Sequence, residues 1–424
     1  MNVDRPRSGV RNVGGDGSSK ARDRASLRRT NLALVLRLLR DAGPRPRTQI
    51  ATETGLPKAT ITNLVAELVE RGLVREGDSA RDGAVGRPSR TLEIDGRSVC
   101  GIGLEISADY VHLIALDLRG EVAAEHRLPL DARAAGPDAV LDRAAEAIRA
   151  TRRTLHGRNA QAVAVTVAAP GVIQRDSGVV SYAPNIGWRE VDVVGGLRER
   201  LGRSCPPVQL ENDAKLGAVA EHLVAAQAGI HDLIYVTGET GVGGGIISDG
   251  RLLRGSAGFA GEIGHMRLAP DGKPCACGRQ GCWETMVGLN ALLEHAAAPD
   301  DLVRDPSVDL EQRLAELRRR ADAGEPATRA ALNRIADGLG LGLTVLADVL
   351  NPRAIVLGGY FAYFGDHFIA QVETELTARV VAPDAGGCTV LASTLGFTAA
   401  ARGGAHASLD FVYQDPGGTM ATPG

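Results

Sequence analysis

Residues 261–284 read Gly261-Glu-Ile-Gly-His265 and, a short distance on, Pro274-Cys-Ala-Cys-Gly-Arg-Gln-Gly-Cys-Trp-Glu284. They offer one imidazole and three thiolates, a complete tetrahedral ligand set for zinc, from His265, Cys275, Cys277 and Cys282. Four protein ligands leave no open position for catalysis, so the pattern predicts a structural zinc ion that orders the loop. Free thiols in a glycine-rich turn, or a disulfide, are the alternatives. Two cysteines separated by one residue, with a third nearby, fit a metal better.

Two carboxylates, those of Glu262 and Glu284, are interleaved with these metal ligands. Zinc does not need them, because the imidazole and the thiolates already complete its coordination. They therefore indicate that the same loop also holds a ligand of another kind.

Length and composition are those of an ordinary globular protein. The chain has 424 residues, enough for two or three domains, with 44% apolar and 23% charged residues. No run approaches the roughly 18 apolar residues of a membrane span, and the N-terminus lacks a signal-peptide core. We therefore expect a cytoplasmic protein with no membrane partner. Clustered thiols suit a reducing compartment, and the scattered Cys100, Cys205 and Cys388 are expected to be small buried hydrophobes.

Charge is distributed unevenly along the chain. The formal net charge is −3, yet residues 1–47 contain twelve lysines and arginines against four acidic residues. A basic head on an acidic body predicts that the N-terminal end meets a polyanion. The alternative is a solvated arm, and residues 1–24 are expected to be disordered in any case because Gly, Ser, Arg and Asp dominate them.

Residues 25–92 predict a winged helix-turn-helix domain. Apolar residues recur at helical spacing from Leu32 to Leu39, and a short helix is expected over residues 49–54. Gly55 then supplies a turn before a third helix over residues 58–71. Two short helices joined by a glycine-containing turn are typical of a helix-turn-helix that binds double-stranded DNA.

The second helix of such a pair usually enters the major groove. Four outward residues near its start are predicted to reach phosphates and base edges: Lys58, Thr60, Thr62 and Asn63. A hairpin follows, with its tip over residues 83–88, where Arg81 and Arg87 are expected to contact phosphates or enter the minor groove. An ordinary helical subdomain is the alternative. The basic hairpin and the local positive charge instead favour a domain that binds a double-stranded DNA operator.

After Leu92 the sequence alternates between apolar strands and helices. It contains two predicted strand pairs, over residues 99–104 with 111–116 and residues 233–237 with 244–248. Two halves that each begin with a strand pair predict a two-lobed α/β body over residues 98–413, with a cleft near residues 211–284. Residues 414–424 carry no motif and are expected to be disordered.

Over Val99 to Gly404 these motifs resemble the ROK family, which comprises repressors, open reading frames and sugar kinases. Gly238 to Gly245 is similar to the family's second phosphate loop, Glu262 to His265 to its sugar-binding signature, and Cys275 to Glu284 to its zinc motif. With the helix-turn-helix in front, the sequence most resembles the transcriptional repressor branch, which includes xylose and N-acetylglucosamine regulators. The resemblance implies an actin-like, ribonuclease-H-like body and a homodimer or homotetramer.

A sugar ring presents hydroxyls that carboxylates and amides can pair with two at a time. Asn212 and Asp213 follow the apolar run 207–210, so they are expected at a strand end facing the cleft; a polar turn or helix cap is the alternative. In the related kinases the aspartate that matches Asp213 is the general base. The predicted sugar-binding residues, several of them implied only by the resemblance, are Gly171, Asn185, Asn212, Asp213, Glu262, His265 and Glu284.

The first phosphate loop departs from the kinase pattern. ROK kinases carry Asp-x-Gly-x-Thr there, and this chain has Glu105, Ser107 and Asp109 at the three positions. A carboxylate at the third position would repel ATP phosphates, and a side chain at the second would crowd them. We therefore expect no catalysis, no ATP and no Mg²⁺, with Asp213 a vestigial general base.

The second loop, Thr237 to Gly245, is better preserved, although Glu239 adds negative charge and such hairpins also serve as simple tight turns. Tyr360 and Phe361 follow the family's adenosine motif where smaller residues are usual. The sequence thus predicts a sugar-responsive repressor that a monosaccharide or derivative releases from its operator. A DNA-tethered, ATP-dependent sugar kinase and a regulator controlled by a protein partner are the alternatives. A ligand that tightens DNA binding is the less expected mode.

Overall fold

The computed structural model describes residues 16–79, 90–381 and 387–418. The chain forms two compact units, one of Met1–Asp95 with Phe411–Gly424 and one of Gly96–Asp410. Within the described ranges, no helix combines the length and the apolar character needed to cross a membrane.

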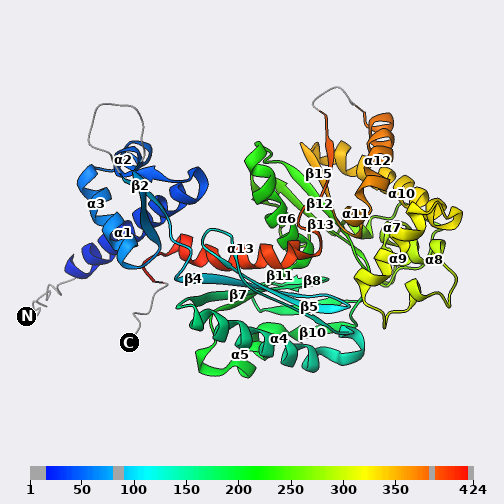
Figure 1. Cartoon of the computed structure of the whole chain (residues 1–424), viewed down its shortest axis with the longest axis horizontal. Helices are drawn as coiled ribbons and strands as arrows, with labels where there is room; N and C mark the ends of the chain where they lie inside the picture. Colours follow the sequence, from blue (N-terminus) through cyan, green and yellow to red (C-terminus); the bar gives the residue numbers. More distant parts are fainter. Residues whose placement is uncertain (1–15, 80–89, 382–386, 419–424) are drawn as a thin grey trace, which may run out of the picture. The chain divides into compact units, whose positions relative to one another are not determined.

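The first unit holds the predicted helix-turn-helix and a small antiparallel sheet of order β1-β3-β2 (Figure 1). Its elements are α1 (Asp16–Ala42), β1 (Arg45–Pro46), α2 (Arg47–Thr54), α3 (Lys58–Glu70), β2 (Val74–Ser79) and β3 (Arg90–Ile94). Gly55 ends α2 in the left-handed conformation (φ 70°), as a turn between the two helices requires. The apolar stripes of α1 and α3 are buried, with Leu36 and Val65 fully inaccessible, so helical periodicity predicted this core correctly.

Two predictions about the ends of the chain are wrong. Helix α1 begins at Asp16, so residues 16–24 are helical where disorder was expected, and residues 1–15 lie outside the described part. The tail is ordered as far as residue 418, because Arg71 donates a 3.0 Å hydrogen bond to the Gly417 carbonyl and the Arg40 guanidinium stacks 4.5 Å from the centre of the Tyr413 ring. Residues 411–413, predicted within the body, therefore belong to the first unit.

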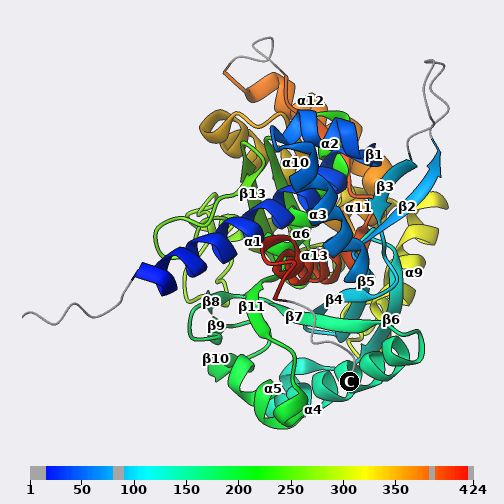
Figure 2. The same ribbon diagram turned by 90° about the vertical axis from the view of Figure 1, so that its left-hand side faces the viewer.

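The second unit begins with a five-stranded sheet of order β11-β7-β4-β5-β6. Its strands are β4 (Val99–Ile106), β5 (Tyr110–Asp117), β6 (Val122–Pro129), β7 (Gln161–Ala169) and β11 (Val208–Asn212). Helices α4 (Ala132–Gly157) and α5 (Val193–Leu201) lie on one face, and α13 (Ala399–Gln414) on the other (Figures 1 and 2). Strand β4 is buried along its whole length, as expected for a strand covered on both faces.

A second five-stranded sheet has the order β14-β13-β12-β15-β16. Its strands are β12 (Leu233–Gly238), β13 (Val242–Ser248), β14 (Arg251–Leu252), β15 (Ala354–Gly359) and β16 (Thr389–Ala392). On one face packs α6 (Asp213–Ala225); on the other pack α8 (Leu289–Ala296), α10 (Pro326–Leu350) and α12 (Gly365–Arg379). Two such sheets, each between helices, confirm the predicted two-lobed α/β body.

A small sheet of order β10-β9-β8 was not predicted. Its strands are β8 (Val172–Gln174), β9 (Val179–Ala183) and β10 (Trp188–Asp192). They are short and follow glycine-rich turns, which leaves little periodicity to detect. This sheet carries the loop of Pro184 and Asn185, which lines the cavity described next.

Candidate functional site

A cavity of about 100 Å³ lies where the end of β11, the β12–β13 turn and the cysteine-rich loop meet. Its wall contains all seven residues predicted to bind sugar: Gly171, Asn185, Asn212, Asp213, Glu262, His265 and Glu284. The wall also reaches beyond the predicted 211–284 span, to Ser107 and Ile186. Residues up to 177 positions apart in the sequence thus line the same cavity, as a single binding site requires.

Asn212 and Asp213 stand at the junction between β11 and α6. Asn212 caps the helix, since its Oδ1 accepts a 3.1 Å hydrogen bond from the Lys215 backbone N–H, and its Nδ2 donates to the Gly171 carbonyl at 3.2 Å. The structure thus shows the helix cap, and the capping residue also lines the cavity. Gly171 has φ 84°, and a side chain there would clash with the Tyr182 carbonyl, so only glycine fits.

The cavity wall carries carboxyl groups with few charged partners. Burial raises the pKa of Asp213, and burial likewise raises the pKa of Glu262, which the cation of Lys215 partly opposes. Desolvated carboxyl groups are costly unless hydrogen-bonded, and a polyhydroxylated ligand would supply those hydrogen bonds. The site is therefore suited to hydroxyl groups.

Gly241, on the turn between β12 and β13, lets two predicted residues approach each other. A Cβ atom there would lie 2.7 Å from Asn185 Nδ2 and 2.9 Å from Glu284 Oε2. The glycine pattern marked this loop, but its place between Asn185 and Glu284 depends on tertiary contacts that the sequence does not reveal.

The four predicted metal ligands converge. The ligand atoms of His265, Cys275, Cys277 and Cys282 all lie within 4.8 Å of one another. The Sγ atoms of Cys277 and Cys282 are 3.7 Å apart, and His265 Nδ1 is 3.7 Å from Cys275 Sγ. A zinc tetrahedron with Zn–S bonds of about 2.3 Å has edges of about 3.8 Å, so the donor set fits zinc. These distances are too long for a disulfide, and all six cysteines are free.

The loop that carries these ligands is anchored from both sides. The isolated bridges Arg267↔Cys282 and Pro274↔Gln280 pair its two arms. The Trp283 indole is fully buried and donates a 2.8 Å hydrogen bond to the Gly338 carbonyl. The metal cluster and the cavity share His265, and Glu284 in the cavity wall contacts Cys275, so whatever orders the loop also positions the cavity wall.

Next to Asp213, on the side where the resemblance places the phosphate loops, the wall is acidic. Glu105 and Glu239 line a small cavity there together with Asp213. Tyr110 Oη donates a 3.2 Å hydrogen bond to Glu105 Oε1, and Ser107 Oγ donates to Glu239 Oε2 at 3.0 Å. The other Glu105 oxygen is buried without a hydrogen-bond partner among the described residues.

The pKa values of Glu105 and Glu239 in this acidic wall are raised. Burial, reinforced by the charge of Asp213, raises the pKa of Glu239 to about 7. Burial, with Glu239 and Asp213 adding repulsion, raises the pKa of Glu105 well above its usual value. Asp109, predicted to repel phosphates, lines a neighbouring cavity together with Arg313, and the acidic wall of the small cavity consists of Glu105, Glu239 and Asp213.

Aromatic residues fill the space behind the glycine hairpin. Tyr360 and Phe361, in α11 (Tyr360–Tyr363), are fully buried, and Tyr360 Oη donates a hydrogen bond to the Val287 carbonyl. Their ring centres are 4.5 Å apart. Tyr360 and Phe361 are therefore core residues. Their large rings, which stand where the family usually has smaller residues, fill the interior of this lobe.

The predicted DNA-contacting residues divide into two groups. Lys58, Thr62 and Asn63 are exposed on α3, and Thr60 on the same helix is partly buried. Arg81 and Arg87 lie outside the described residues. The exposed start of α3 is thus free to meet a partner, as a recognition helix must be.

Comparison with known proteins agrees with these observations. The family model described as "ROK family" matches residues 101–410, and the "IclR helix-turn-helix domain" model matches residues 30–78. The chain is 29% identical over 365 residues to a xylose repressor of Caldicellulosiruptor bescii, covering 83% of this chain and 88% of that protein. It is 29% identical over 361 residues to the DNA-binding transcriptional dual regulator NagC of Escherichia coli, covering 84% and 86%.

Solved structures have the same fold. A ROK family transcriptional regulator, a homologue of the E. coli MLC protein, superposes with a TM-score of 0.73 at 23% identity, covering 92% of this chain and 97% of that one. A ROK glucokinase from Streptomyces griseus, solved with glucose and AMPPNP, superposes with a TM-score of 0.61 at 28% identity, covering 73% and 98%. Since the first family model spans most of the sequence, the chain belongs to the ROK family.

Proposed function

We propose that this protein is a sugar-responsive DNA-binding transcriptional regulator, a repressor that a monosaccharide or a derivative releases from its operator. The observation that carries the proposal is the convergence of the seven predicted residues on one cavity in a chain that also carries a helix-turn-helix. Relatives along most of the chain are named xylose repressor and N-acetylglucosamine repressor, which supports a sugar as the effector.

The cleft favours a sensor over a kinase. Phosphoryl transfer requires an electropositive cradle around the phosphates, with carboxylates only where a metal needs them. Here Glu105 and Glu239 stand beside Asp213, and these three carboxyl groups offer the phosphates of ATP no positive charge. Asp213 retains a use without ATP, because a carboxylate can accept hydrogen bonds from sugar hydroxyls in the ground state. An ATP-dependent sugar kinase is the alternative function, because a ROK glucokinase solved with AMPPNP has a similar structure.

We assign a structural zinc ion to His265, Cys275, Cys277 and Cys282, because their donor atoms have the spacing of a tetrahedron. Zinc would cross-link a loop that has little apolar core of its own. The residues that benefit are Glu262 and Glu284, whose carboxylates flank the ligands and line the cavity.

Regulation would act through a cytoplasmic homodimer or homotetramer on a roughly palindromic operator. Two α3 helices would then read half-sites one or two helical turns apart. Sugar binding would close the cleft and change the spacing between the two recognition helices. By linkage, the sugar weakens operator binding by the same factor as the operator weakens sugar binding.

The test is operator release by the purified protein, with DNA from upstream of its own gene at fixed ionic strength. Each monosaccharide of a panel that includes xylose, glucose and N-acetylglucosamine is added in turn. Release by one of them supports the proposal and identifies the effector. Tight operator binding that no sugar weakens would contradict the proposal and favour a regulator controlled by a protein partner.

A further inference from the structure

A second, larger cavity adjoins the sugar cavity in the body of the protein. Its volume is about 300 Å³, against about 100 Å³ for the first. The two cavities share Ala108, Asn185 and Thr240 in their walls. A ligand seated beside Asp213 therefore has room to continue past these three residues.

The second cavity is polar and electrically balanced. Its charged lining residues are three acidic and three basic: Asp109, Asp131, Glu294, Arg133, Arg304 and Arg313. Such a wall offers hydrogen-bond donors and acceptors without net charge, which suits a neutral polyol. A phosphate or carboxylate group would be attracted by the three guanidinium groups and repelled by the three carboxylates, so the wall gives an anion no net electrostatic preference. Leu289, Leu293 and Pro306 add apolar surface for the C–H groups of a ring.

Arg313 is the most constrained of these donors. Only 6% of the residue is exposed, and its Nε donates a 2.8 Å hydrogen bond to the Val303 carbonyl. That bond fixes the guanidinium plane, while its two Nη groups have no hydrogen-bond partner within the ranges described. A buried guanidinium with unused N–H groups at a cavity wall is poised to donate to a ligand.

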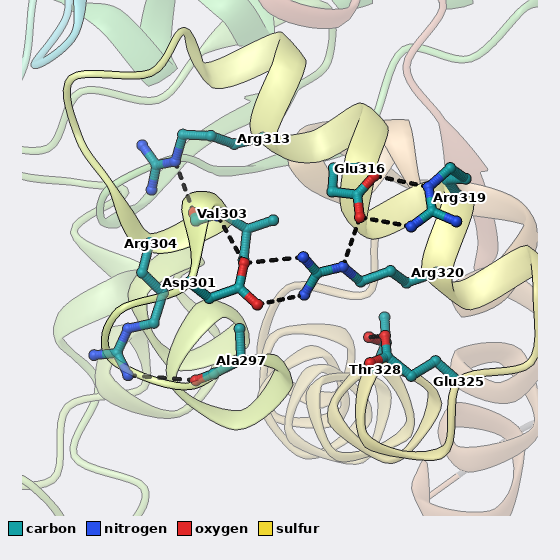
Figure 3. Close-up of polar contacts among 10 residues, drawn as sticks. All are labelled: Ala297, Asp301, Val303, Arg304, Arg313, Glu316, Arg319, Arg320, Glu325 and Thr328. Carbon is teal, nitrogen blue, oxygen red and sulfur yellow. Dashed lines mark hydrogen bonds and ion pairs between the residues drawn. The ribbon is translucent and has the colours of Figure 1, made fainter.

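A network of ion pairs holds this part of the wall in place (Figure 3). Arg320 makes two hydrogen bonds, of 2.7 and 2.9 Å, to the carboxylate of Asp301, and a third, of 2.8 Å, to Glu316. Asp301 in turn accepts from the Val303 backbone N–H at 3.1 Å. The segment Leu302–Arg304 is thereby fixed before any ligand arrives, which reduces the entropic cost of binding.

We propose that the second cavity binds the second ring of a disaccharide or glycoside whose first ring occupies the cavity beside Asp213. The inference rests on the proposed sugar-sensing function and specifies the effector as a sugar with at least two rings. The second ring of this effector hydrogen-bonds to Arg313 and to the surrounding carboxylates.

Calorimetric titration of the full-length protein tests the proposal with matched pairs of sugars. The pairs are xylose with xylobiose, glucose with cellobiose and with maltose, and N-acetylglucosamine with its β-1,4-linked dimer. One disaccharide should bind about tenfold or more tightly than its monosaccharide, as expected for one or two added hydrogen bonds to a charged group.

Two variants and a control locate the second ring. Arg313→Gln removes the charged donor, and Asn290→Trp fills the cavity from an exposed position on α8. Each should abolish the preference for the disaccharide and leave monosaccharide affinity within twofold of wild type. Arg319→Gln, an exposed member of the same ion-pair network that does not line the cavity, should retain the preference.

The outcomes separate this inference from the proposed function. Monosaccharide binding with no disaccharide bound more tightly would overturn the second subsite and leave the sugar sensor standing. A disaccharide preference that persists in Asn290→Trp would also overturn it. If neither member of any pair binds, both the subsite and the sugar-sensing function are wrong.

Discussion

The carboxylate of Glu284 connects the metal cluster to the sugar cavity: its Oε1 lies 2.7 Å from Cys275 Sγ, and the same side chain lines the cavity. Its Oε1 also lies 3.4 Å from His265 Nδ1. Movement of the cysteine loop must therefore move a residue of the proposed sugar site. We therefore expect sugar affinity to depend on the metal.

Removing one metal ligand should accordingly weaken sugar binding. We expect Cys277→Ala to lose the zinc ion, to unfold at a lower temperature and to bind the effector about tenfold or more weakly, because the loop with Glu262 and Glu284 loses its cross-link. Elemental analysis, thermal unfolding and calorimetry measure the three effects. Cys388→Ala, outside the cluster, is the control. Full zinc content with normal sugar affinity in Cys277→Ala would show that the ligand assignment is wrong.

The acidic wall should give the stability of the protein a characteristic pH dependence. The pKa of Glu239 rises on folding from an ordinary value of 4.5 to about 7, chiefly by burial. Folding stability is therefore lost as the pH rises from 4.5 through 7, since the folded state must then hold a buried charge. Glu239→Gln should be the more stable protein at pH 8, by about 1–3 kcal/mol, and this gain should vanish near pH 4.5.

Denaturant unfolding at a series of pH values measures this difference. Glu316→Gln is an informative control because it has the opposite sign: hydrogen bonds from Arg319 and Arg320 lower the pKa of Glu316 to about 2. The stability that Glu316 contributes is present above pH 4.5 and lost as the pH falls toward 2. A Glu239→Gln gain that is constant between pH 4.5 and 8 would refute the raised pKa.

No ATP-dependent phosphorylation of hexoses or pentoses is expected from the purified protein. Glu105, Glu239 and Asp213 line one small cavity on the side where the resemblance places the phosphate loops, and they offer the phosphates no positive charge. A coupled assay for ADP release measures the activity, with a ROK glucokinase as the positive control. Detectable turnover that disappears in Asp213→Asn would mean that the protein is a kinase.

Lys58, exposed at the start of α3, should contribute to DNA affinity alone. We expect Lys58→Gln to weaken operator binding and to reduce the salt slope of log K by about 0.9, the value for one lost phosphate contact. Sugar affinity should not change. The control is Arg153→Gln, an equally exposed basic residue on α4. Equal salt slopes for Lys58→Gln and wild type would contradict the docking of α3 on the phosphate backbone.

Much of the site could be predicted from the sequence because its residues follow local rules. Asn212 and Asp213 lie at the end of an apolar run that forms most of β11, and this end of the strand opens into the cavity. The cysteine spacing identified the donor cluster, because four ligands close together in the chain have little freedom to be apart. The helix-turn-helix followed from helical periodicity and from the turn at Gly55.

The missed features depend on long-range contacts. The C-terminal tail is held by the hydrogen bond from Arg71 to the Gly417 carbonyl. The sequence around the tail gives no sign of this contact, because the two residues are far apart in the chain. The second cavity is similar, since its wall joins Asp109 to Arg313, residues from segments far apart in the sequence.

The most direct test of the account measures effector-induced operator release in wild type, Glu262→Gln and Lys58→Gln at one ionic strength. Glu262 lines the cavity and Lys58 lies on α3. We predict that the sugar releases wild type from DNA, that Glu262→Gln binds the operator normally but needs at least tenfold more sugar, and that Lys58→Gln binds the operator weakly with unchanged sugar affinity. Release of Glu262→Gln at the wild-type sugar concentration would contradict the claim that this cavity controls DNA binding.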